Sequence, residues 1–140
     1  MISKKELEEL KEKVLGYSIG EFPRSSVYAI ILYAGACKYH FGLKEEFGDY
    51  DVNLFFISDK QNRKLSIYGR PKIIGSFKSK KVEIWRNLII GKNKEFDIKV
   101  LMNYMESKIG SSKRWGKIAS QKLLLIYPYI SEFSVRELII

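Results

Sequence analysis

The sequence predicts an α+β or α/β protein in which helices pack on a β-sheet. Two observations indicate this class. Short apolar runs at residues 27–33 and 52–57 have the length and the β-branched content of buried strands. Around them, apolar residues recur at intervals of three and four, which is typical of amphipathic helices. A chain of 140 residues can bury a core of its own, so we expect a single domain over residues 1–140.

The first half of the chain predicts a helix, a strand, a short helix and a second strand. Ser3 and Glu6 have capping-box spacing, which favours a helix over residues 4–15 that ends at Gly16. The strand at 27–33 is followed by a short helix at 36–41 and a loop. The strand at 52–57 comes next, and we expect the two strands to be neighbours in the core.

The second half is less regular. Short strands with turns fit residues 61–81, and Pro71 favours an edge strand because proline donates no hydrogen bond to a sheet. A strand is expected over 81–90 and a helix from Phe96 to about Lys108. A last long helix is expected from Ser112, ending before Pro128. The tail from residue 129 to 140 fits either a strand or a helix.

The charge of the chain favours anionic partners. Lys and Arg number 25 against 16 Asp and Glu, a net charge of +9 with a pI near 9.5. Such a surface attracts nucleotides, RNA or other polyanions. No apolar stretch is long enough to span a bilayer, and charged residues replace the apolar segment of a signal peptide. One cysteine allows no internal disulfide, so we expect a cytoplasmic protein with no membrane partner.

Two carboxylates directly precede the second expected strand. Asp49 and Asp51 point to the same face, because side chains in a strand alternate with a period of two. Paired carboxylates beside a buried strand repel each other unless a cation lies between them. Mg²⁺ (or Mn²⁺) suits such oxygen ligands. The alternative is a solvated pair of loop residues after Gly48.

A glycine follows the first strand. Gly35 opens the short helix, and without a side chain its backbone N–H group can approach a phosphate closely. The alternative is that Gly35 only provides the backbone freedom needed at the junction between strand and helix.

Together these residues resemble the nucleotidyltransferase superfamily related to polymerase beta. Its signature is an apolar residue, Gly, then Gly or Ser, a spacer of about a dozen residues, and Asp-apolar-Asp or Glu; the match covers residues 32–56. The resemblance implies a mixed sheet with helices packed on it, and Mg²⁺-dependent transfer of a nucleoside monophosphate from a nucleoside triphosphate to a hydroxyl of RNA, a protein or a small molecule. It implies that Asp49 and Asp51 are catalytic metal ligands and that Gly35 and Ala36 contact the triphosphate, although Ala36 lacks the family's serine hydroxyl.

The resemblance also asks for a third carboxylate on a later strand. Glu83 lies between Val82 and Ile84 in a strand pattern and is the first choice as catalytic metal ligand. Asp97 is the second choice, but it falls where a helix is expected. Each has an alternative: Glu83 as an exposed strand residue, and Asp97 as an acid favoured by the helix dipole.

A basic group lies at the start of the last helix. Lys113 and Arg114 follow two serines and precede Trp115, with Lys117 one turn on. Backbone N–H groups, two cations and an indole favour phosphate or base contact, so Lys113 and Arg114 are candidate nucleotide-binding residues. The alternative is that Trp115 packs in the core and the cations cover the surface.

Two other function classes fit the sequence. Ala36 favours a nucleotide- or RNA-binding or interaction module without turnover. The run Asp97, Ile98, Lys99 resembles restriction-type nucleases, which would need these residues on a strand. The chain leaves little room for an acceptor-binding domain, so a homodimer or a partner chain would complete the site.

Overall fold

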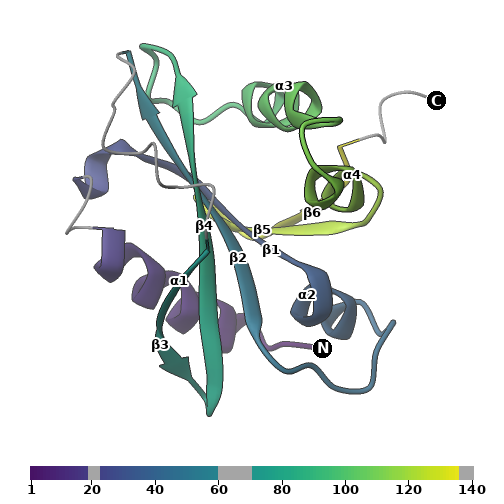
Figure 1. Ribbon diagram of the computed structural model, residues 1–140. Helices are drawn as coiled ribbons and strands as arrows, with labels where there is room; N and C mark the ends of the chain where they lie inside the picture. The colour runs from purple at the N-terminus through teal and green to yellow at the C-terminus, as the bar shows by residue number, and fades with distance from the viewer. Residues whose placement is uncertain (19–22, 60–70, 136–140) are drawn as a thin grey trace.

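The computed structural model describes residues 1–18, 23–59 and 71–135. They form one mixed sheet in the order β3-β4-β2-β1-β5-β6, with helices on its two faces (Figure 1). The strands are β1 (Val27–Tyr33), β2 (Tyr50–Ser58), β3 (Lys72–Phe77), β4 (Lys80–Ile90), β5 (Leu123–Tyr127) and β6 (Ser131–Phe133). The helices are α1 (Lys4–Ser18), α2 (Ala34–His40), α3 (Ile98–Lys108) and α4 (Lys113–Ala119), with a 3₁₀ turn η1 at Arg24–Ser26. The expected α+β class is confirmed.

The pairing of three central strands positions the candidate site. β1 runs antiparallel to β2, and β2 runs parallel to β4 from Tyr50 opposite Val82 to Ser58 opposite Ile90. The beginnings of β2 and β4 therefore meet at the end of the sheet where β1 finishes with Tyr33.

Two apolar layers cover the sheet. On one face, residues of α1 such as Leu10 and Val14 pack with Ile30 and Leu54 of the strands. On the other face, side chains of α3 and α4 pack on alternate residues of the same strands, for example Ile31. Because both faces of β1 and β2 are covered, their sequences are nearly continuous apolar runs. Asp51 and Tyr33 belong to the α3/α4 face by the same alternation.

Several predicted elements are confirmed. The strands expected at 27–33 and 52–57 are β1 and β2, and they are neighbours. β3 follows Pro71 and lies at the edge of the sheet, as expected. Part of the irregular region expected at 61–81 lies outside the described residues. The helix α1 continues two residues beyond Gly16, because the cost of one helical glycine, about 1 kcal/mol, is small beside the packing of its apolar face.

The prediction of a long last helix is wrong. α4 ends at Ala119, and Leu123–Tyr127 is strand β5, paired with β1 and β6. Its first four residues are fully covered, and an apolar run buried on both sides fits a strand as well as a helix by periodicity alone. The tail contains the short strand β6.

Within the described ranges, no helix has the length and apolar character that crossing a membrane requires.

Candidate functional site

A row of three polar side chains crosses the sheet at its β1 end. Tyr33 lies opposite Asp51, and Asp51 lies opposite Glu83 in the parallel register. Paired strands are about 4.8 Å apart, so Asp51 and Glu83 are direct neighbours on the α3/α4 face. Both are half-buried. The structure therefore brings together the two acids that the sequence placed on different strands.

The acids act on one another electrostatically. Burial raises the pKa of the Asp51 carboxyl above its ordinary 3.8, the charges of Glu83 and Asp49 raise it further and Lys44 opposes them, so that together they bring the pKa to about 6. Asp49 lies just before β2 and is half-buried. A carboxylate in this position is destabilised unless a positive charge reaches it.

The acids do not form a closed metal site on their own. Among the residues that the structure describes, no group of three or more His, Cys, Asp or Glu side chains is gathered closely enough to hold a metal ion. The donors present still fit Mg²⁺, which commonly binds one or two carboxylates and takes its other ligands from water and substrate phosphates. Asp51 and Glu83 supply such a pair, with Asp49 beside it.

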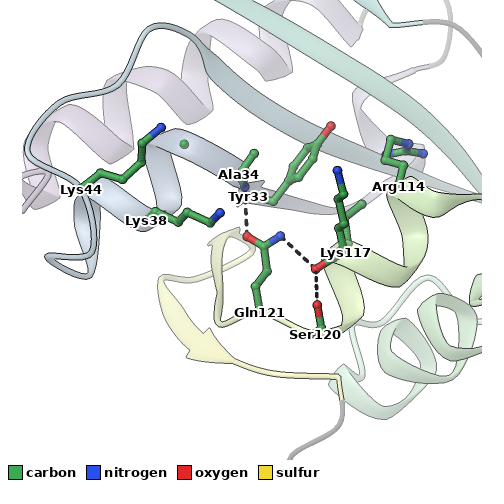
Figure 2. Close-up of a pocket in the computed structure, with 10 residues that line it drawn as sticks. Tyr33, Ala34, Lys38, Lys44, Arg114, Lys117, Ser120 and Gln121 are labelled. Atoms are coloured by element: carbon green, nitrogen blue, oxygen red, sulfur yellow. Dashed lines mark hydrogen bonds between the residues drawn. The ribbon is translucent and has the colours of Figure 1, made fainter.

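A cavity of about 600 Å³ opens next to this row, between the end of β1, α2 and α4 (Figure 2). Its volume is in the range of small-ligand sites. Among the residues that the structure describes, its lining includes four cationic side chains and no acidic one. The described lining residues are Tyr33, Ala34, Gly35, Lys38, Lys44, Arg114, Lys117, Ile118, Ser120 and Gln121. None of the four cations forms an ion pair with an acid in the described ranges. The described lining of the cavity is thus positively charged.

The wall of the cavity depends on a strained turn. Ala34 has φ +59°, a left-handed conformation that is costly for a residue with a side chain. Its N–H group donates to Gln121 Oε1 at 3.2 Å, and Gln121 Nε2 donates to the Lys117 carbonyl at 3.1 Å (Figure 2). Gln121 therefore joins the turn between β1 and α2 to α4 across the cavity.

Gly35 leaves space beside a cation. A Cβ atom added to Gly35 would lie 3.7 Å from Lys44 Nζ and 3.8 Å from Phe47 Cβ. These are ordinary contact distances, so a side chain would not clash but would take space next to the ammonium group.

Arg114 is held in one position. Its Nη1 donates to Asn53 Oδ1 at 3.0 Å, and its Cζ atom lies 3.9 Å from the centre of the Trp85 ring and 4.7 Å from that of Trp115. It also forms a hydrogen bond with the Tyr33 hydroxyl, and burial lowers its pKa. A guanidinium fixed in this way can bind phosphate oxygens without a large loss of side-chain entropy.

A buried amide pair supports this arginine. Asn87 Nδ2 donates to Asn53 Oδ1 at 3.2 Å, so the Asn53 oxygen accepts two hydrogen bonds. Asn53 is fully buried, and its Nδ2 has no hydrogen-bond partner among the described residues.

The predicted nucleotide-binding residues divide into two groups. Gly35 and Arg114 line the cavity. Ala36 is fully buried and does not line it, and Lys113 is exposed and does not line it either. Trp115 packs in the core under α4, as its alternative interpretation expects.

Other cavity residues were missed as candidates. Lys38 lies three residues after Gly35, and Lys117 three residues after Arg114; residues at this spacing share a helix face, which was the available signal. Lys44 and Gln121 come from connecting segments, for which periodicity gives no signal.

Asp97 is not part of this site. It caps α3, where its Oδ1 accepts a hydrogen bond from the Lys99 N–H at 2.9 Å. Its backbone N–H donates to the Tyr28 hydroxyl at 2.9 Å, and Tyr28 stands at the beginning of β1, the opposite end from Tyr33. The structure therefore separates Asp97 from Asp51. It also places Lys99 on a helix, not on the strand that a nuclease site would need.

No protein-family model matches this chain, and no curated protein or solved structure shows significant similarity to it.

Replacing Ala34 with glycine should stabilise the protein. Relief of the left-handed strain outweighs the entropy cost of glycine, so Ala34→Gly is expected to raise the free energy of unfolding by about 0.5–1 kcal/mol in urea denaturation. The matched control is Ala36→Gly, which lies inside α2 and should lower it by about 1 kcal/mol. Equal destabilisation by both variants would contradict the strained turn.

Asp51→Asn should stabilise the ligand-free protein in a pH-dependent way. Because the folded pKa of about 6 exceeds the ordinary 3.8, the folded state binds more protons, and stability falls as the pH rises from about 4 to 6. Partial exposure of the carboxyl reduces the full effect, so we expect a gain of about 1–2 kcal/mol at neutral pH and none near pH 4.

Thermal or urea denaturation at the two pH values checks this, with Asp59→Asn as control. Asp59 is exposed just beyond the far end of β2, and its substitution should leave the free energy of unfolding unchanged at both pH values. Loss of stability in Asp51→Asn at neutral pH would show that the carboxylate makes a stabilising contact and would contradict the electrostatic account.

Proposed function

We propose that this protein binds a nucleoside triphosphate with Mg²⁺ and transfers its nucleoside monophosphate to an acceptor hydroxyl. One observation carries the proposal. The cationic cavity opens directly after Tyr33, and Tyr33 is the strand neighbour of Asp51, which is itself the neighbour of Glu83. An anion site and a carboxylate pair thus adjoin, as phosphoryl transfer with a metal ion requires.

The four cations of the cavity have the role of phosphate binding. A triphosphate brings several negative charges, and Lys38 and Lys117 offer ammonium groups from facing helices (Figure 2). Arg114 adds a guanidinium that its neighbours already orient, which favours two parallel hydrogen bonds to one phosphate. Lys44 lies beside Gly35 and also acts on the Asp51 carboxyl, so it stands between the phosphates and the acids.

The carboxylates would hold the metal. Asp51 and Glu83, with Asp49, are the side chains that would ligate Mg²⁺ or Mn²⁺. When bound, the metal supplies charge neutralisation at the phosphate and a lowered pKa for the attacking hydroxyl. The raised pKa of Asp51 supports this role, because a carboxyl that is destabilised as an anion gains most from a cation.

A second candidate is nucleotide binding without transfer. Ala36 stands where the resembled family has a serine and is fully buried, and the described acids are not gathered into a group of three. Both observations favour a module that binds a nucleotide in the cavity and catalyses nothing.

Calorimetric titration of nucleoside triphosphates, with and without Mg²⁺, tests the proposal. The double variant Lys38→Ala/Lys117→Ala should bind roughly thirtyfold to a thousandfold more weakly, since each of the two charge-assisted hydrogen bonds contributes about 1–2 kcal/mol. Asp49→Asn/Asp51→Asn should lose the Mg²⁺ dependence. The matched control is Lys92→Ala/Lys94→Ala, two exposed lysines beyond the far end of β4, which should bind like the wild type.

Pyrophosphate release then separates the two candidates. Transfer predicts release in the presence of an acceptor, abolished by Asp51→Asn. Binding without release in any acceptor mixture favours the second candidate. Failure of every triphosphate to bind would contradict both.

A further inference from the structure

The edge of the sheet at β3 is open in the described part of the chain. β3 pairs with β4, and the order of the sheet ends with β3; the strand at the opposite edge, β6, has only three residues. Figure 1 shows β3 at the border of the sheet, beside α1. Alternate residues of an edge strand point their N–H and C=O groups away from the sheet. β3 has six residues, so it can pair with another strand over an ordinary strand length.

The two faces of this edge differ in character. On the α3/α4 face, which Ile73 shares with its partner in β4, the Ile73 side chain is 56% exposed. On the α1 face, Lys72 Nζ lies 5.2 Å from the centre of the Tyr17 ring of α1. Lys13 reaches the same side from α1, because its Nζ would lie 3.6 Å from a Cβ atom added to Gly75. A further strand at this edge therefore meets an apolar side chain on one face and cations on the other.

Gly75 leaves room for a second backbone at the edge. It has φ +102° and lies within the register shift between Ile73 and Ser76. Apart from its chain neighbours, the only described atoms within 4 Å of an added Cβ belong to the flexible Lys13 side chain. A glycine inside a strand often marks the close approach of another backbone.

The charge of the edge indicates which kind of strand fits it. Residues 71–82 contain four lysines and no acidic residue. Lys13 adds a cation from α1, and it forms no ion pair with an acid in the described ranges. A second copy of this chain would bring the same lysines, and lysines on an edge strand are a common means of preventing such self-association. An acidic segment has the complementary charge.

We propose that the β3 edge binds an extended acidic segment of a partner protein, which joins the sheet as a further strand. The backbone N–H and C=O groups of the segment pair with those of β3. Because side chains of a strand alternate between faces, the segment carries carboxylates on the α1 face, toward Lys13 and Lys72, and β-branched apolar side chains on the other face, beside Ile73. The inference is independent of the proposed function, since none of the described residues that line the cavity belongs to β3.

NMR titration of the ¹⁵N-labelled protein with a synthetic peptide of alternating Glu and Val tests the proposal. We expect the largest amide shifts at Lys72–Phe77, with cross-strand NOE contacts between the peptide backbone and β3. The same peptide with every backbone amide N-methylated should not bind, because it has no N–H groups to donate to the strand. A peptide of alternating Lys and Val should not bind either, because its charge has the wrong sign.

Two charge variants test the face on which the carboxylates lie. Lys13→Gln/Lys72→Gln should weaken binding of the Glu-Val peptide roughly twofold to thirtyfold, as expected for the loss of two exposed ion pairs. Lys13→Gln alone should give a smaller weakening and serves if the double variant does not fold. The matched control Lys92→Gln/Lys94→Gln removes the same charge beyond the far end of β4 and should leave the Kd unchanged.

Strand pairing at β3 that requires both the acidic side chains and the N–H groups of the peptide supports the proposal. No binding at millimolar peptide, equal binding of the N-methylated peptide, or equal weakening by both double variants overturns it. Self-association of the protein through β3 would identify a second copy as the occupant and also overturns it. The same holds if a single-stranded oligonucleotide shifts the β3 amides and the peptide does not.

Discussion

The parallel pairing of β2 with β4 is the constraint on which the site depends. It places the N-terminal ends of β2 and β4, which are far apart in sequence, at one end of the sheet. The antiparallel β1 finishes at that same end. A shift of one residue in the register would turn every side chain of the moved strand to the other face. Such a shift would also separate the buried amides of Asn53 and Asn87, which are hydrogen-bonded at 3.2 Å between β2 and β4, so this buried contact helps to fix Asp51 beside Glu83.

The site places groups of opposite charge side by side. Acids are crowded at the strand ends, and four cations line the adjacent cavity without acidic partners in the described ranges. Burial disfavours the charged form of Asp51 and of Arg114, and the proposed ligand, which carries both phosphates and a divalent cation, would bring an opposite charge to each. The left-handed Ala34 adds local strain at the same place. Strain and uncompensated charge concentrated in one region are typical of binding sites held ready by the surrounding fold.

Sequence patterns predicted the parts of this arrangement better than their assembly. The strands at 27–33 and 52–57 could be predicted because their apolar runs are local, whereas β5 was taken for helix because an apolar run buried on both sides has no distinguishing period. Glu83 could be placed on a strand, but its alignment with Asp51 comes from pairing between distant segments. Asp97 offered the same residue type as Glu83, and only the path of the chain shows that it caps α3. Lys44 reaches the cavity from a loop, where no periodic signal exists.

The central claim is that Asp51 belongs to a carboxylate pair that takes up a divalent cation. Carboxyl-detected NMR titration of Asp51, with and without Mg²⁺, tests it most directly, and Asp51→Asn assigns the resonance. The account predicts a pKa of about 6 without metal, and a decrease of roughly one unit or more when Mg²⁺ is added, because a bound cation favours the anion. An ordinary pKa that does not respond to Mg²⁺ would contradict the claim.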